Sequence, residues 1–294
     1  MVNAFQYTLF YYTPLYYYNP SYFQLATYRD AIATRKITGV TFGAYYPFNK
    51  YYRTQASIGY YKYEEDVLDP SFGSLAQFWN GNQLAATFSL LGETTRFKYP
   101  YGPTTGNTFK LSLTQAIPVS TSFLMNTTVE SDLRQYLNIG GDALFAFRFR
   151  GFSSRGKNPY LFYWGGNNEV RSMGYYSIIA NEGWYANLEF RLPLINAAST
   201  IIGQIGPVRG VLFFDLTRAK IKGSSGKMYN VNKARWWEPS DAIGSYGYGF
   251  EFFFLGLPIH LEFVKSLDIL DISHPLDINT VGKFRTKFWI GFDF

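Results

Sequence analysis

Two carboxylates lie two residues apart in the first half of the chain, at Glu130 and Asp132, and Arg134 follows at the same spacing. Paired carboxylates can supply the acid and the nucleophile or base of glycoside hydrolysis. However, residues spaced by two line one face of a β-strand, and a charge ladder on a solvated strand face explains this row better than catalysis. We therefore predict that the protein is not an enzyme.

Metal and cofactor chemistry has few candidate ligands in this sequence. Cysteine is absent and the two histidines are His260 and His274, too few for a thiolate or histidine-based centre. His260 and Glu262 share a strand face, where an interior hydrogen bond is the simpler interpretation. The glycines of Gly244–Gly249 suggest a phosphate loop, but no helix follows them, so we expect them to make room on a strand. We expect no metal and no cofactor.

The net charge of +6 and the pI near 9.2 would suit a nucleic-acid partner. The basic residues are nevertheless spread singly along the chain, and no recognition motif is present. We therefore expect no nucleic-acid partner and attribute these charges to solvated strand faces.

The stretch from Tyr160 to Leu194 has two halves of different character. The first surrounds Arg171 with two asparagines and with Gly165, Gly166 and Gly174, a composition typical of a structured loop. The second alternates perfectly and predicts a strand with one apolar and one polar face. The apolar face carries Trp184, Ala186, Leu188, Phe190, Leu192 and Leu194, and the polar face carries Tyr185, Asn187, Glu189 and Arg191.

The same alternation recurs along the whole chain and predicts about 13 strands without a helix or a linker. The last strand is the clearest, with Phe284, Thr286, Phe288, Ile290, Phe292 and Phe294 on one face. The predicted strands are 4–13, 21–32, 36–47, 51–65, 82–96, 106–117, 122–137, 143–152, 183–194, 207–219, 242–256, 257–268 and 282–294.

Aromatic residues make up 20% of the chain, although its mean hydropathy is only −0.12. No apolar run approaches the roughly 18 residues of a membrane helix, so any membrane span must consist of strands. The core of a soluble β-sandwich, about 10 Å thick, would be crowded by so many rings, whereas aromatic girdles of a membrane barrel accommodate them. We predict an all-β, antiparallel transmembrane β-barrel; the alternative is a soluble, aromatic-rich binding protein with two packed sheets.

Three motifs carry a resemblance to the BamA/TamA family of outer-membrane assembly barrels, also called bacterial surface antigens. They are Gly165-Gly166-Asn167-Asn168-Glu169-Val170-Arg171 with Gly174-Tyr175, then Glu189-Phe190-Arg191-Leu192-Pro193, then Phe213-Phe214-Asp215. The end of the chain, Phe288 to Phe294, resembles the family's final strand. In detail the chain is most similar to the subgroup whose barrel follows a TolB-type propeller. It departs from the motif at Ser172-Met173, where the family has glycine and an aromatic residue.

The resemblance implies that the loop around 160–181 folds back into the lumen, where its arginine meets acidic groups of the inner wall. The matching residues are Arg171, Glu189 and Asp215, and strand parity independently places both carboxylates on inner faces. A guanidinium has five donors in a planar fork, so it can bridge two carboxylates. The alternative is that all three residues are merely solvated in the lumen.

The resemblance also implies a location and a function. The chain would be an integral barrel of the Gram-negative outer membrane that inserts or translocates protein, or lipid. Its partners would be outer-membrane lipid, client proteins, and periplasmic or lipoprotein subunits. The alternative is a barrel that is plugged by its own loop and anchors a periplasmic domain or partner complex.

Residues 1–294 are expected to form a single C-terminal barrel domain. The family's barrel is of a 16-stranded type, with five strands after the central loop and eleven before it, of which about eight can be traced here. We therefore expect the first strands to lie outside this chain and residues 4–13 to form an open edge. The start of the chain has no cationic segment followed by an apolar one, so no export signal is visible.

Overall fold

The computed structural model describes residues 1–11, 33–67, 80–99, 102–176, 178–196, 198–200, 203–220, 242–254, 257–268 and 284–291. Within these ranges, the regular secondary structure consists of β-strands. The described part of the chain contains no helix long and apolar enough to cross a membrane.

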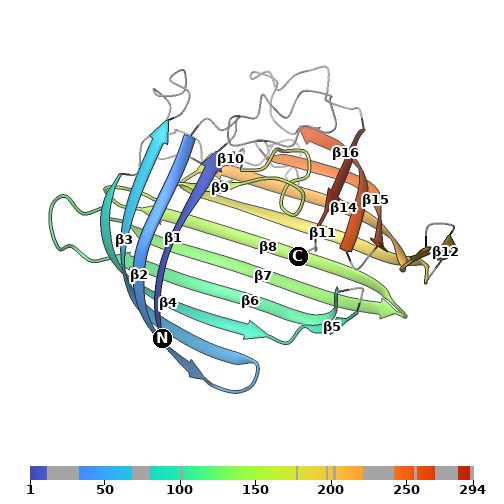
Figure 1. The fold of residues 1–294 in the computed structure, drawn as a ribbon, viewed down its shortest axis with the longest axis horizontal. Helices are drawn as coiled ribbons and strands as arrows, with labels where there is room; N and C mark the ends of the chain where they lie inside the picture. Colours follow the sequence, from blue (N-terminus) through green and yellow to red (C-terminus); the bar gives the residue numbers. More distant parts are fainter. Residues whose placement is uncertain are drawn as a thin grey trace, which may run out of the picture.

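One antiparallel sheet of 13 strands forms the wall of the molecule and curves from β1 to β17 (Figure 1). Its first half contains β1 (Val2–Tyr11), β2 (Ala33–Pro47), β3 (Tyr52–Val67), β4 (Gly81–Glu93), β6 (Gly102–Ala116), β7 (Thr127–Gly140) and β8 (Ala143–Arg155), with β5 (Arg96–Lys98) paired to β6. Its second half contains β11 (Glu182–Ile195), β14 (Val208–Lys220), β15 (Ile243–Phe254), β16 (Leu257–Asp268) and β17 (Arg285–Ile290).

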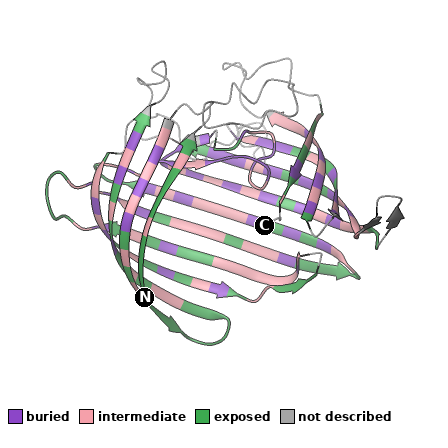
Figure 2. Ribbon diagram, in the orientation of Figure 1, coloured by how far each residue is buried: buried purple, intermediate pink, exposed green. Residues whose placement is uncertain are grey.

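Burial alternates along these strands with the period of two that the sequence predicts (Figure 2). On β11, Asn187 and Glu189 are buried, while Leu188 between them is 46% exposed. On β14, Asp215 is buried and Leu212 is 53% exposed. Polar residues thus lie inside and apolar residues outside, as a lipid-facing barrel wall requires. The antiparallel barrel wall is confirmed, and the two-sheet soluble sandwich is wrong.

The first strands differ from the expected meander. Residues 21–32 lie outside the described part of the chain, and the strands on either side of them pair directly, with Tyr11 opposite Ala33. The strand expected to begin at residue 122 begins at Thr127. Leu124 turns into the interior and packs against Ile37 and Tyr63, so residues 122–126 do not extend this strand.

The sheet is open in the described residues. There β1 pairs with β2, β17 pairs with β16, and no pairing joins β1 to β17. Whether further strands precede β1 stays a prediction.

Two short hairpins interrupt the path from β8 to β15. The strands β9 (Phe162–Trp164) and β10 (Ile178–Ala180) pair with each other, and β12 (Ala198–Thr200) pairs with β13 (Gly203–Ile205). The β9–β10 hairpin packs against the inner wall in an apolar cluster. The cluster comprises Phe152, Phe162, Trp164, Val170, Ile178, Ala180 and Tyr185. The loop between β9 and β10, which carries the predicted site, is therefore held inside the curved sheet.

Candidate functional site

Three carboxylates converge on the inner face of the second half of the sheet. Glu189 lies on β11, Asp215 on β14 and Glu262 on β16, and all three are at most 3% exposed. The register places Asn187 of β11 opposite Asp215, and Asp215 opposite Ser245 of β15. Strand parity and register together therefore bring one polar surface of four neighbouring strands into the interior.

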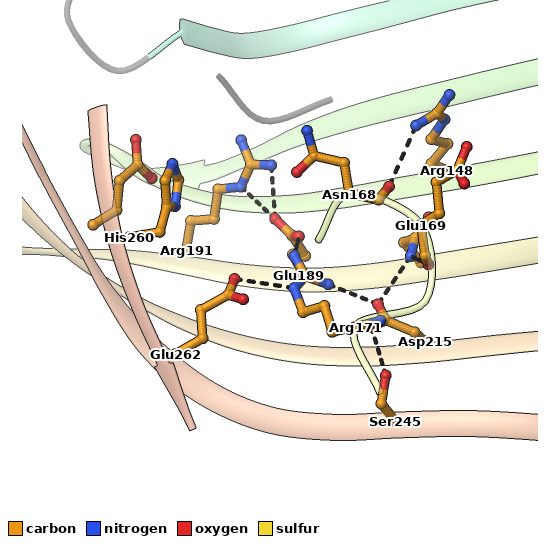
Figure 3. Close-up of polar contacts among 12 residues, drawn as sticks. Arg148, Asn168, Glu169, Arg171, Glu189, Arg191, Asp215, Ser245, His260 and Glu262 are labelled. Atoms are coloured by element: carbon orange, nitrogen blue, oxygen red, sulfur yellow. Dashed lines mark hydrogen bonds and ion pairs between the residues drawn. The ribbon is translucent and has the colours of Figure 1, made fainter. Parts of the chain in front are cut away.

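Arg171, at the tip of the β9–β10 loop, pairs with all three carboxylates (Figure 3). Its Nη1 donates to Asp215 Oδ1 at 2.7 Å, its Nε to Glu262 Oε1 at 3.0 Å, and its Nη2 to Glu189 Oε1. The backbone N–H of Arg171 also donates to Asp215 Oδ2, at 3.1 Å. The side chain is 1% exposed. All three nitrogens of one guanidinium are thus used on three different strands.

The inner face of β15 leaves room for this arrangement because it carries glycines. One of the groups that needs this room is the ring of Phe213, whose centre lies 4.3 Å from Arg171 Cζ in a cation–π contact. A Cβ at Gly247 would lie 2.7 Å from Phe213 Cζ and 2.0 Å from a backbone oxygen. A Cβ at Gly249 would lie 3.0 Å from Glu262 Cγ. Side chains at these two positions would displace groups that contact Arg171.

The carboxylates have further partners, as buried charges require. Glu189 Oε2 accepts from Arg191 Nε at 2.8 Å. Asp215 accepts from Asn187 Nδ2 at 2.9 Å and from Ser245 Oγ at 2.8 Å. The cluster therefore belongs to a wider interior hydrogen-bond network.

Glycines shape the loop that carries Arg171. Gly165 and Gly166 have φ values of 116° and 115°, which side-chain-bearing residues rarely adopt. A Cβ at Gly166 would also lie 2.5 Å from the Tyr175 ring. Gly174, the third predicted loop glycine, is buried directly before Tyr175.

The two residues that depart from the family motif both contact the structure around them. Ser172 Oγ donates to the Gly244 carbonyl oxygen at 3.1 Å, which attaches the loop tip to β15. Met173 packs against the apolar cluster around Trp164. The altered tip is therefore docked by contacts of its own.

Glu169 joins the loop that carries it to Gly165 at the start of the same loop and to Tyr185 on β11. Its Oε2 accepts from the Gly165 N–H at 2.7 Å and its Oε1 from the Tyr185 hydroxyl at 3.0 Å. Burial raises the pKa of Glu169, and the hydrogen bond from Gly165 and the charge of Arg150 oppose that rise. The sequence pattern alone did not predict an individual role for Glu169.

The structure brings the predicted residues Arg171, Glu189 and Asp215 into direct contact. That this ion cluster acts as a lock, which holds the loop in the lumen, stays a prediction. Glu262 was not predicted as a partner of Arg171, although its inward parity was a usable signal. The ring of His260, which shares its strand face, stacks on Trp289 with centroids 3.6 Å apart.

The remaining candidate residues are placed as follows. Asp132 accepts from both Arg134 and Arg148, so the suspected catalytic carboxylate is part of a charge ladder. Of the terminal-strand residues, Phe288 and Ile290 lie on the outer face and are 55% and 54% exposed. Phe292 and Phe294 lie outside the described residues.

Comparisons with known proteins agree on the fold. Among solved structures, BamA from Haemophilus ducreyi lacking POTRA domains 1–3 matches with a TM-score of 0.61 and 15% identity, over 87% of this chain and 55% of that chain. CdiB from Escherichia coli matches with a TM-score of 0.56 and 14% identity, over 88% and 45%. CdiB from Acinetobacter baumannii matches with a TM-score of 0.54 and 12% identity, over 88% and 42%. This chain thus spans about half the length of these relatives. No curated protein matches it.

A family model described as the Omp85 superfamily domain matches residues 3–262, which is most of the chain. The match includes the Arg171 loop and all three carboxylates around it. The chain therefore belongs to the Omp85 superfamily and is a β-barrel of the bacterial outer membrane.

Proposed function

We propose that this barrel inserts polypeptides into the outer membrane or translocates them across it, with the Arg171 loop docked in its lumen. The observation that carries the proposal is the burial of Arg171 against Glu189, Asp215 and Glu262. The family resemblance supplies the class of function, and the geometry supplies the part of this chain that would control it.

The Arg171 contacts couple the loop to the wall. One guanidinium joins β11, β14 and β16, so the position of the loop depends on how these strands lie relative to one another. Removing one partner of a buried ion cluster leaves an uncompensated charge, which is strongly destabilising. The docked loop is therefore a defined state that a passing polypeptide must either accommodate or displace.

The direct test is reconstitution of the full-length protein in liposomes. A urea-denatured outer-membrane barrel is added as client, and its assembly is followed by the mobility of its compact band on gels. We expect faster assembly than in liposomes that contain an unrelated porin. A parallel assay with a secreted polypeptide would detect translocation as protection from external protease.

The two assays also separate the alternatives. Acceleration of assembly alone assigns insertion, and protection alone assigns translocation. If neither occurs while the barrel is folded, the proposal is wrong and the barrel is better explained as a loop-plugged anchor. In that case a periplasmic domain or partner complex should copurify with it.

Two finer expectations from the sequence stay proposals. One is that residues 1–294 are the C-terminal barrel domain of a longer protein whose first strands lie outside this chain. The other is that the chain is most similar to the subgroup whose barrel follows a TolB-type propeller.

A further inference from the structure

The interior loop has a second attachment, near the start of its β9–β10 hairpin. We call residues 160–164 and 178–180 the stem and residues 165–176 the tip. Arg35 of β2 is fully buried and points at the stem. Its Nη1 donates to the Leu161 carbonyl oxygen at 3.1 Å, and its Nη2 donates to the Tyr163 hydroxyl at 3.4 Å.

The guanidinium of Arg35 is fixed from the wall side by Glu65. The two residues lie directly opposite each other on β2 and β3, and the Glu65 side chain is only 6% exposed. Arg35 Nε and Nη2 both pair with Glu65 Oε1. The rings of Tyr160 and Tyr163 lie 4.9 Å and 5.0 Å from Arg35 Cζ, so aromatic faces of the stem complete the cation's surroundings.

The two attachments lie far apart in the order of the sheet. The stem is held by β2 and β3 through Arg35 and Glu65, whereas the tip is held by β11, β14 and β16 through Arg171. Trp164, the last stem residue before the tip, donates from Nε1 to Thr217 Oγ1 of β14 at 2.8 Å, so the stem also contacts β14. Figure 1 shows β9 and β10 between the first and last strands of the curved sheet.

We propose that Arg35 is a second positioning residue of this loop, oriented by Glu65, and that the loop braces the lumen between the first and last strands. Arg35 binds the stem from β2, whereas Arg171 binds the tip to β11, β14 and β16. The glycines Gly165 and Gly166 lie at the junction, so the tip can leave the wall while the stem stays bound. The inference goes beyond the proposed function, because it holds for a transporter and for an anchor alike.

The stem anchor also defines an interior cavity. A space of about 330 Å³ lies between the stem and the inner wall. Tyr160, Tyr163, Tyr61 and Tyr63 line it together with Glu130. Release of the stem would remove one side of this cavity and open it. Release of the tip alone would leave the stem residues that line the cavity in place.

Because the chain has no cysteine, single introduced thiols can report on each part of the loop. Ala180→Cys reports on the stem and Val170→Cys on the tip, since both residues are fully buried. Each reporter is combined with Arg35→Met, Arg171→Met or Arg209→Met in the full-length protein in detergent micelles. Arg209 is the matched control, because it forms an equally buried ion pair with Glu251 between β14 and β15. The rate of reaction with a membrane-impermeant maleimide is measured.

We expect Arg35→Met to raise the labelling rate of Ala180→Cys by roughly tenfold or more, the factor that corresponds to about 1.4 kcal/mol of local opening. Labelling of Val170→Cys should change less. Arg171→Met should give the reverse pattern, and Arg209→Met should leave both reporters protected.

Two further variants keep the test decisive if Arg35→Met does not fold. Arg35→Met/Glu65→Gln removes both charges, so no unpaired carboxylate remains in the interior. Arg35→Lys keeps the charge opposite Glu65 but loses the planar fork that reaches Leu161 and Tyr163. Protection of Ala180→Cys in any compactly folded Arg35 variant without these contacts would overturn the proposal. Equal exposure of the stem by Arg209→Met would overturn it as well.

Discussion

Arg171 satisfies three carboxylates at once because a guanidinium presents its donors in several directions of one plane. The ammonium group of lysine is a compact point charge and cannot reach three fixed acceptors with the same geometry. Asp215 depends on Arg171 most closely, since it also accepts the backbone N–H of the same residue. At this scale the site is one cation whose removal leaves three buried anions short of a partner.

We therefore expect Arg171→Ala to cost about 3–5 kcal/mol of barrel stability, the usual result of leaving buried charge uncompensated. The temperature at which the compact band converts to the unfolded band on gels should fall, and protease should cut within Gly165–Tyr175. Arg171→Lys should restore part of the loss.

The control for this series is Arg155→Ala. Arg155 pairs with Glu182, but its side chain is 77% exposed, and exposed ion pairs contribute little. If Arg155→Ala and Arg171→Ala lowered the conversion temperature equally, the lock would be refuted.

At the scale of the element, side chains of a strand alternate between its two faces, and this alternation decides whether a residue lies on the outer face or in the interior. Leu113 and Thr114 are neighbours on β6; Leu113 is 48% exposed on the outer face, and Thr114 lines the interior cavity. The inner face is not uniformly solvated, however. Asn187 is fully buried and donates to Asp215, so a substitution there would disturb the site rather than report on parity.

Leu113→Arg should destabilise the barrel in lipid by about 2–4 kcal/mol near the bilayer midplane and by less toward the interfaces. Thr114→Arg should cost less, because its charge can reach water in the cavity. Denaturant unfolding of both variants in liposomes measures the difference. A larger cost at Thr114 would contradict the assignment of the outer face to lipid.

At the scale of the whole molecule, the loop connects the two halves of the sheet through two separate anchors. A loop that has lost one anchor is still held near the wall by the other, which keeps the effective concentration of the freed part high. The two ion clusters are therefore expected to act together on barrel stability, even though they share no residue.

The double variant Arg35→Met/Arg171→Met should lower the temperature of compact-band conversion by more than the sum of the single variants. The physical reason is that only the double variant frees the whole loop. A double-mutant cycle on gels measures the coupling. Strictly additive shifts would mean that stem and tip detach independently and that the loop does not brace the lumen.

The sequence by itself determined the wall and the direction of each side chain along it. Alternation at Leu188, Glu189 and their neighbours predicted which residues face lipid and which face inward, because the pleat of a strand is a local property with a fixed period. The same parity placed Glu189 and Asp215 inward, and the glycines around Arg171 indicated a structured loop. The family resemblance, which rests on sequence motifs alone, then paired these three residues.

Only the tertiary structure decided which distant residues meet inside the wall. Arg171 and Glu262 are 91 positions apart, and Arg35 and Leu161 are 126 positions apart. Parity says that a side chain points inward, but it does not say which other inward side chains lie within its reach. That depends on the register between strands and on the curvature of the whole sheet, which are set by all strand pairings together. The third carboxylate at Arg171 and the second anchor at Arg35 therefore exist only because the sheet curves around the loop.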